Sequence, residues 1–185
     1  MIPPYTPHGI LPPFLAEPTD PVGRSPYDAT IDEVIARFST SPRRRTILAG
    51  FLDFRAALRA AGMTTGAQWL DGSFVEDRGT EPKDVDVVTF HMLAPADDAA
   101  FAAGHPELSR AKLTKASFTV DAYFVPLCGT NRWSVVPVTS YWYGLFSHQR
   151  VTERWKGMVQ VRLESPDDDA GARAALAAAS AGGAP

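Results

Sequence analysis

The chain has 185 residues, 45% of them apolar, and carries 18 Lys and Arg against 21 Asp and Glu, a formal net charge of -3. This size fits one compact domain with at most a small extension, and the near-balanced charge excludes a global basic field that would recruit nucleic acid without a dedicated patch. The single cysteine, Cys128, excludes an intramolecular disulfide and a multi-cysteine zinc site, and it is typical of a reducing cytoplasm.

The N-terminal segment, residues 1–28, is predicted to be an extended arm because it holds eight of the sixteen prolines, which fix φ and remove backbone donors. Its apolar residues Ile10, Leu11, Phe14 and Leu15 favour an ordered strap over the core rather than a proline-motif ligand for another protein. The segment lacks the basic start and unbroken apolar stretch of a signal peptide, and nowhere do about 18 apolar residues run together. We therefore expect a cytoplasmic protein with no membrane partner.

Two helices are predicted next. Thr30 and Glu33 have the spacing of a capping box, which predicts a helix over 31–39. Ser41 followed by Pro42 predicts the start of the longest helix, which should end at Gly62. Arg43, Arg44 and Arg45 lie in its first turn, where cations oppose the helix dipole; a solvated basic turn is favoured over an anion site.

The remaining elements are predicted from apolar periodicity and β-propensity. Strands are expected over 67–70, 85–92, 117–125 and 157–163, with broken helical and turn material over 95–112 and an aromatic-rich helix over 137–146. The domain should thus span residues 29–165 and belong to the α/β (α+β) class. Residues 166–185 are acidic and then rich in Ala and Gly, which favours disorder, with a frayed helix as the alternative.

The stretch "LDGSFVEDRGTEPKDVDVV", residues 70–88, carries the clearest chemical signal. Asp84 and Asp86 are two positions apart in an apolar run, so on a strand their carboxylates share one face and repel each other. Gly72 and Ser73 stand ten intervening residues earlier, where a glycine permits close backbone approach and a serine offers a hydroxyl. Paired carboxylates of this kind suit a site for divalent cations.

This pattern resembles the signature of the DNA polymerase beta nucleotidyltransferase superfamily, in which a Gly-Gly or Gly-Ser pair precedes an Asp-apolar-Asp-apolar run. The resemblance implies the nucleotidyltransferase fold, a small mixed sheet flanked by helices. It also implies two Mg2+ ions, with Mn2+ as a possible substitute, held by Asp84, Asp86 and a third carboxylate on a neighbouring strand. Asp121, in "FTVDAYFV", is the candidate for that third carboxylate and for orienting or deprotonating the attacking hydroxyl.

Further residues are candidates for the nucleotide. Beside Gly72 and Ser73, the cations Lys83, Arg150 and Lys156 could hold phosphates, as could Arg78, although a solvated basic rim is an equal alternative. His91 is expected to be an ordinary packed or exposed histidine. The aromatic-rich region could stack a base, but aromatics at this density more often form core; it comprises Trp133, Tyr141, Trp142, Tyr143, Phe146 and Trp155.

A closer resemblance is to a family of small, largely uncharacterised prokaryotic nucleotidyltransferase-like proteins, over nearly all of residues 9–163. It rests on the segments "GILPPF", "PRRR", "DGSFV", "PKDVDVV", "VDAYF" and "YWYGLFSHQRVTERWKGMVQVRL". Two features depart from this family. The link after the proline motif, "FLAEPTDPVGRSPYDAT", is longer than the short link expected, and the alanine-rich tail is not part of the family pattern.

Two functions are expected. The first is a Mg2+-dependent nucleotidyltransferase that moves an NMP from an NTP to a hydroxyl on RNA, such as a tRNA 3′ end, on a protein or on a small molecule. By analogy of fold, it could belong to a toxin-antitoxin or phage-defence locus and act with a protein partner from that locus. The alternative is a catalytically silent binding module, an antitoxin or scaffold, that acts through a protein partner.

Overall fold

The computed structural model describes residues 1–129, 132–164 and 166–181, which form a mixed α and β structure. Its five-stranded sheet has the order β1-β5-β2-β3-β4. The strands are β1 (Tyr27–Asp28), β2 (Gly66–Asp71), β3 (Val85–His91), β4 (Val120–Pro126) and β5 (Val159–Arg162). β2 pairs antiparallel with β3 and β5, whereas β3 with β4 and β1 with β5 run parallel. The predicted mixed sheet is therefore confirmed at the level of its class.

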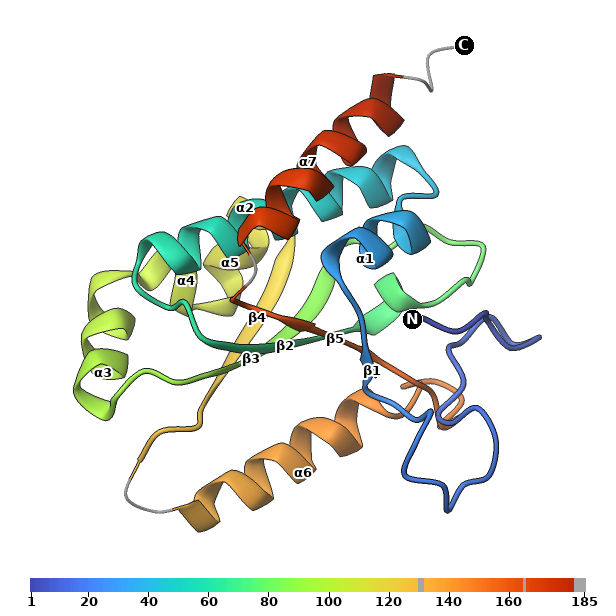
Figure 1. Ribbon diagram of the computed structural model, residues 1–185, viewed down its shortest axis with the longest axis horizontal. Helices are drawn as coiled ribbons and strands as arrows, with labels where there is room; N and C mark the ends of the chain where they lie inside the picture. Colours follow the sequence, from blue (N-terminus) through green and yellow to red (C-terminus); the bar gives the residue numbers. More distant parts are fainter. Residues whose placement is uncertain (130–131, 165, 182–185) are drawn as a thin grey trace.

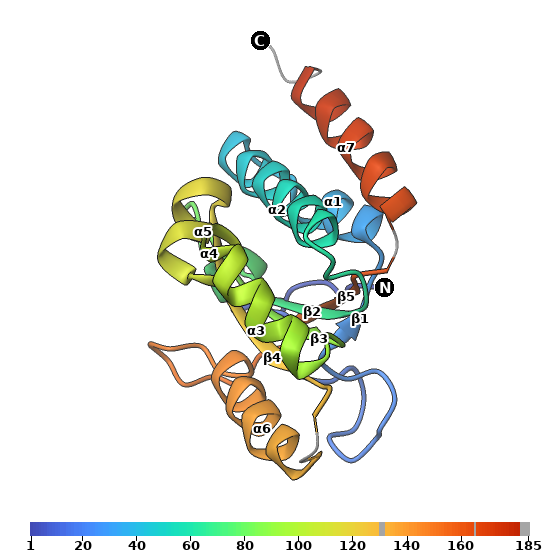
Figure 2. The ribbon, with the colours of Figure 1, turned by 90° about the vertical axis from the view of Figure 1, so that its left-hand side faces the viewer.

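Helices lie on both faces of the sheet (Figure 1). One face carries α1 (Ile31–Phe38), α2 (Pro42–Ala60), α4 (Pro106–Ser109), α5 (Ala111–Phe118) and α7 (Pro166–Ala181), and α6 (Val135–Phe146) lies on the opposite face. The view from the side shows α3 (Pro95–Gly104) in front of the sheet, between these layers (Figure 2). Two short 3-10 turns complete the described elements, η1 (Gly72–Val75) and η2 (Arg132–Ser134).

Each face of the sheet has its own apolar core. The larger cluster packs α1, α2 and α7 on the sheet through residues such as Phe38, Phe51 and Leu58. The smaller cluster lies under α6 and includes Trp69, Val88 and Phe146. Because β3 contributes Val87 to one cluster and Val88 to the other, the strand is buried on both faces, as its nearly continuous apolar sequence requires.

The first two helices follow their sequence signals closely. Both arms of the predicted capping box are present, since Thr30 Oγ1 accepts from the Glu33 backbone N–H and the Glu33 carboxylate accepts from the Thr30 N–H. Ser41 caps α2 through the Arg44 N–H, and Pro42 occupies the first turn. The strand predicted over 117–125 is wrong at its start, because residues 117 and 118 close α5 and Thr119 turns the chain with φ +56 into β4.

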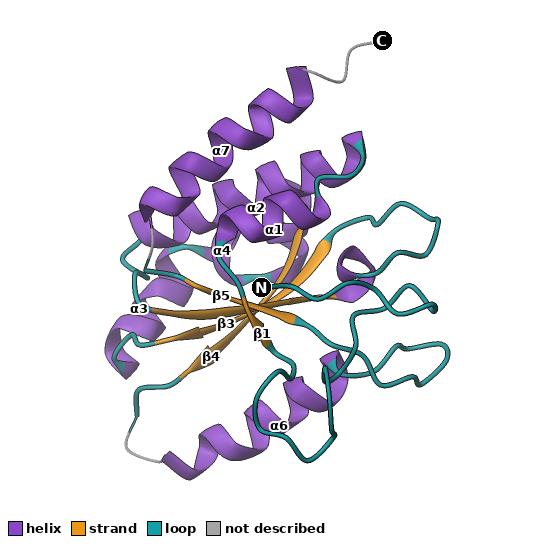
Figure 3. Cartoon of the chain, turned by 45° about the vertical axis from the view of Figure 1, so that its right-hand side comes forward, coloured by secondary structure: helices purple, strands orange, loops and turns teal. Residues whose placement is uncertain are grey.

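The proline-rich arm is an ordered strap in part (Figure 3). Ile10 and Leu11 are buried, the Leu11 carbonyl accepts from the Gly157 N–H at 2.8 Å, and the Gly9 carbonyl accepts from the Asp77 N–H at 2.7 Å. Leu15, in contrast, is 58% exposed. The strap thus fastens the N-terminus beside the loop that follows Gly72.

The predicted disorder of residues 166–185 is wrong for 166–181, which form α7, while residues 182–185 lie outside the described residues. Ala172 and Leu176 are buried in the larger core, and Asp169 receives hydrogen bonds from Arg55 at 2.9 to 3.1 Å. In the described part of the chain, no helix combines the length and apolar character needed to span a bilayer.

Candidate active site

The three predicted aspartates converge because of strand register. Asp86 on β3 is paired with Asp121 on the parallel strand β4 and with Asp71 on the antiparallel strand β2. Asp84 lies just before β3, two residues from Asp86. A row of carboxylates therefore crosses three adjacent strands at one edge of the sheet.

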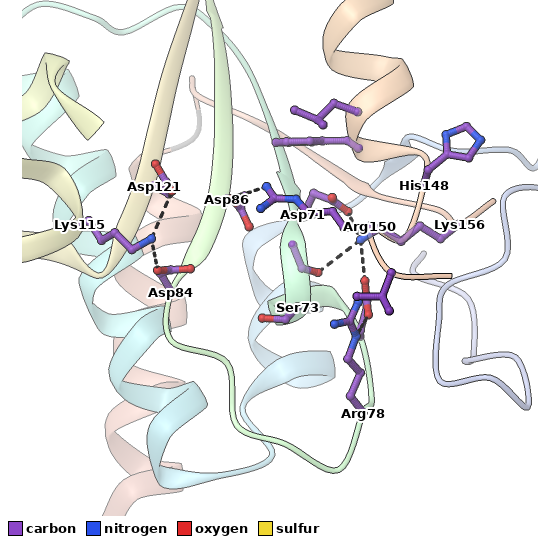
Figure 4. Close-up of a pocket in the computed structure, with 15 residues that line it drawn as sticks. Asp71, Ser73, Arg78, Asp84, Asp86, Lys115, Asp121, His148, Arg150 and Lys156 are labelled. Atoms are coloured by element: carbon purple, nitrogen blue, oxygen red, sulfur yellow. Dashed lines mark hydrogen bonds and ion pairs between the residues drawn. The ribbon is translucent and has the colours of Figure 1, made fainter. Parts of the chain in front are cut away.

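These side chains line a single cavity of about 270 Å³ (Figure 4). Asp84 and Asp86 are each 14% exposed and Asp121 is 18% exposed, so each carboxylate is largely removed from water. The predicted residues that line the cavity are Gly72, Ser73, Arg78, Asp84, Asp86, Asp121, Arg150 and Lys156. The geometric part of the prediction holds, in that the aspartates lie together beside Gly72 and Ser73.

Gly72 is required by the backbone and by its neighbour. Its φ is +80, and a Cβ built there would lie 1.8 Å from Asp86 Oδ2. A glycine at this point lets the end of β2 turn directly beneath the Asp86 carboxylate. The Gly-Ser pair and the aspartate pair therefore pack directly against each other, through Gly72 and Asp86.

Each of the three carboxylates faces a cationic side chain. Lys115 Nζ lies 2.6 Å from Asp84 Oδ2 and 3.3 Å from Asp121 Oδ2. Arg150 Nη2 lies more loosely, 3.9 Å from Asp86 Oδ1. Burial, followed by the charges of Asp84 and Asp121, raises the pKa of Asp86, and hydrogen bonding to Asp84 is the main cause that raises the pKa of Lys115.

Lys156 was predicted to bind phosphate, and its surroundings contradict that role. The side chain is 2% exposed, and its Nζ lies 2.8 Å from both Asp71 Oδ1 and Glu76 Oε1 and 3.4 Å from the Gly72 carbonyl oxygen. The ammonium group is thus engaged by ion pairs with two carboxylates and by hydrogen bonds to Glu76 and the Gly72 carbonyl. Lys156 instead holds the base of the cavity together.

The buried cluster around Lys156 perturbs its members. Burial raises the pKa of Asp71 to about 7, against the lowering effect of Lys156. Burial acts in the same direction on Glu76, but Lys156 and further hydrogen bonds prevail and lower its pKa. For Lys156 itself burial lowers the pKa, and the two carboxylates outweigh it so that the pKa is raised. The cluster therefore favours a charged lysine.

Lys83 does not lie in the cavity wall, contrary to its predicted role, and its side chain is exposed. The loop that contains Lys83 is held in place by arginines from the first turn of α2. Arg44 is buried and donates to the carbonyls of Phe74 and Glu76, each at 2.6 Å, and Arg43 donates to the carbonyls of Pro82 and Lys83. The "PRRR" segment is therefore a brace for the loop that joins β2 to β3, and only in part a solvated turn.

The aromatic-rich region is divided between core and surface. Phe146 is buried and lines the cavity, whereas Trp133 is 82% exposed and Tyr141 is 61% exposed. A shallow groove of about 590 Å³ adjoins, lined by Thr139, Ser140, Tyr143, Gly144, Ser147, His148 and Trp155. His148 belongs to the walls of both spaces. The base pocket stays a prediction.

Sequence reasoning missed four polar residues of the cavity, Asp71, Glu76, Lys115 and His148, and two apolar ones, Leu145 and Val151. Asp71 directly precedes Gly72, and its register partner is Asp86, so a period-two reading of the whole motif could have found it. Lys115 precedes Asp121 by six residues across a helix end, and no sequence pattern marks such a contact.

A metal ion could be held by Asp84, Asp86 and Asp121, because Mg2+ prefers carboxylate oxygens. Among the described residues, however, no three His, Cys, Asp or Glu side chains are gathered as closely as a metal site requires. In this structure the side chains of Lys115 and Arg150 face the three carboxylates.

Comparison with known proteins places the chain in one family. No protein with a curated description matches it, and no solved structure does. One family model matches residues 3–162, which is most of the chain and includes every residue of the cavity. The chain therefore belongs to DUF6932, a family of unknown function.

Proposed function

We propose that the protein is a Mg2+-dependent nucleotidyltransferase, which moves an NMP from an NTP to a hydroxyl group and releases pyrophosphate. The observation that carries the proposal is the convergence of Asp84, Asp86 and Asp121 in one cavity beside Gly72 and Ser73. An RNA end and a protein side chain are the acceptors that we propose, in a cytoplasmic setting and with a possible partner from a toxin-antitoxin or phage-defence locus.

The topology supports a nucleotidyltransferase fold in particular. The Gly-Ser turn ends β2, the aspartate pair opens the antiparallel strand β3, and the third aspartate lies on the parallel strand β4. This is the order and strand context that the superfamily resemblance implies. Helices on both faces agree with it (Figure 1).

The residues of the cavity suit the steps of transfer. Bound Mg2+ would neutralise developing charge on the phosphate oxygens and clamp the attacking and leaving oxygens. Asp84, Asp86 and Asp121 would hold the metal, and Asp121 would accept the proton of the attacking hydroxyl as its oxygen bonds to the α-phosphorus and pyrophosphate leaves. Ser73 lines the same wall and would orient phosphate oxygens, and Arg150, 75% exposed, is free to turn toward them.

A specific observation favours a second candidate function. Lys115 already forms ion pairs with both Asp84 and Asp121, as a cation in a site that does not bind metal would do. In that case the protein would be a binding module that acts through a partner. Exposed apolar side chains around α6, such as Trp133, Val136 and Tyr141, could serve such a partner.

Transfer of label from each of four α-labelled NTPs, with Mg2+, onto total RNA or lysate protein tests the proposal. We expect labelled product with the wild-type protein and a loss of at least about a hundredfold in Asp86→Asn, because the metal would lose one ligand. Lys83→Met is the matched control, since Lys83 lies in the same loop outside the cavity, and it should retain activity. Absence of product with all four NTPs on both acceptor classes favours the binding module.

A further inference from the structure

Two lysines meet the carboxylates of the cavity in different ways. Lys156 is 2% exposed and is held by Asp71, Glu76 and the Gly72 carbonyl. Lys115 is 48% exposed and reaches its two carboxylates from the last turn of α5. A side chain with one end in solvent can leave its ion pair at little cost, whereas a buried one cannot. Lys115 is thus the lysine that can move.

The ammonium of Lys115 lies between two of the carboxylates that are proposed to hold the metal. Its Nζ is 2.6 Å from Asp84 Oδ2 and 3.3 Å from Asp121 Oδ2, and both oxygens point at it (Figure 4). Asp84 directly precedes β3 and Asp121 lies on β4, so two segments of the chain bring carboxylates to this one lysine. The single charge of Lys115 therefore occupies the space in which a divalent cation would find its oxygen ligands.

We propose that Lys115 is a displaceable counter-ion that sets the metal affinity of this site. While the metal is absent, Lys115 offsets the repulsion among the carboxylates of Asp84, Asp86 and Asp121; a divalent cation binds by exchange with the ammonium group. The inference rests on the proposed function, since it assumes that these carboxylates are metal ligands. It assigns to the chain a residue that tunes metal binding and is not itself a ligand.

The exchange explains the apparent conflict within the site. The carboxylates converge on one cavity, yet no three acidic or histidine side chains of the described residues are arranged as a closed metal site. With Lys115 in place, Asp84 and Asp121 are oriented toward an ammonium group and Asp86 is oriented toward Arg150. Apparent affinity for the metal is then reduced by the fraction of molecules in which Lys115 holds the carboxylates.

Direct titration with Mn2+, followed by the loss of the free-ion electron paramagnetic resonance signal, tests this exchange without any measurement of activity. We expect Lys115→Met to bind Mn2+ roughly threefold or more tightly than the wild type, because competition from an exposed ion pair is removed. Lys115→Arg, which retains a competing cation, should stay near the wild type. Lys112→Met is the control, since it removes an equal charge from the same exposed helix outside the cavity. Lys115→Gln repeats the test if the methionine variant folds poorly.

The outcomes separate this inference from the proposed function. If the wild type binds Mn2+, Asp86→Asn weakens that binding and Lys115→Met leaves the affinity unchanged or lower, the exchange is overturned and the metal site stands. If neither the wild type nor Lys115→Met binds Mn2+, both ideas fail. Binding by Lys115→Met alone supports the exchange and assigns the wild type to the silent state.

Discussion

At the scale of single residues, the shape of the cavity depends on one glycine, Gly72, and one buried lysine, Lys156. Gly72 lies under the Asp86 carboxylate with φ +80, and Lys156 holds Asp71 and Glu76 in a buried cluster. The first residue could be singled out from the sequence, since it belongs to a recognisable motif. The role of Lys156 could not be predicted from the sequence, because its hydrogen-bond partners Gly72 and Glu76 lie 84 and 80 positions earlier in the chain.

Gly72→Ala should destabilise the protein and displace Asp86. The left-handed φ costs about 1 to 2 kcal/mol for any residue with a Cβ, and the clash with Asp86 Oδ2 adds to it. Gly79→Ala is the matched control because its φ is +68 and a Cβ there meets nothing within 4 Å. Urea denaturation of both variants isolates the clash as their difference. Equal losses of stability would contradict the close approach of Gly72 to Asp86.

Lys156→Met should lower the free energy of unfolding by about 3 to 5 kcal/mol, because it leaves two buried carboxylates without their cation. Arg150→Met, which removes a side chain that is 75% exposed, should cost no more than about 1 kcal/mol. Denaturant titration of the two variants measures both values. A Lys156 variant as stable as the Arg150 variant would restore the interpretation of Lys156 as a free phosphate-binding cation.

At the scale of elements, the pattern of apolar residues predicted most of what was found. Strands β3 and β5 lie within the predicted ranges 85–92 and 157–163. The helices capped by Thr30 and Ser41 begin at the expected positions. For α7 the sequence favoured disorder over the alternative of a frayed helix, because its composition is too poor in large apolar residues to suggest burial. What holds it is an ion pair between residues 114 positions apart, Arg55 and Asp169, which no local pattern reveals.

Asp169→Ala should therefore destabilise α7 and, with it, the core that α7 covers. Arg55 is fully buried and Asp169 is 4% exposed, so removal of the carboxylate leaves an uncompensated buried charge and should cost about 3 to 5 kcal/mol. Arg173→Ala, in the same helix, breaks an exposed pair with Asp53 and should cost no more than about 1 kcal/mol. Hydrogen exchange of α7 amides, together with denaturation, reports the difference. Exchange equally slow in both variants would refute the anchoring role of Asp169.

His91, at the end of β3, should make stability sensitive to acid. Its side chain is fully buried, and burial lowers its pKa from the ordinary 6.5 despite the opposing effect of Asp98. The unfolded chain then binds more protons than the folded protein below about pH 6.5, so the free energy of unfolding decreases as pH falls through that range. In His91→Phe this component of the pH slope should disappear, which denaturant titration at several pH values measures. An unchanged slope in His91→Phe would exclude His91 as its source.

At the scale of the whole molecule, the fold brings the ends of three strands to one edge and braces the connecting loop from outside. The N-terminal strap bonds to Asp77, Arg43 and Arg44 bond to the loop carbonyls, and Lys156 holds the loop from within. The sequence was sufficient to predict that Asp84, Asp86 and Asp121 would lie beside Gly72, because alternation along the strands places their side chains on one face. It was not sufficient to predict that Lys115 of α5 would face Asp84 and Asp121, because no local pattern marks that contact.

We propose that this cavity binds an NTP together with Mg2+ through Asp84, Asp86 and Asp121. The heat stability of the purified protein, with ATP, GTP, CTP or UTP and Mg2+, reports such binding without an acceptor. At a ligand concentration of about one hundred times Kd, one NTP should add about 2.7 kcal/mol, which raises Tm by roughly 5 to 10 °C; Asp84→Asn/Asp86→Asn should lose the shift relative to its own ligand-free Tm. If the Tm responds to none of the four nucleotides, or if the shift survives in the double variant, these aspartates do not form an NTP and Mg2+ site.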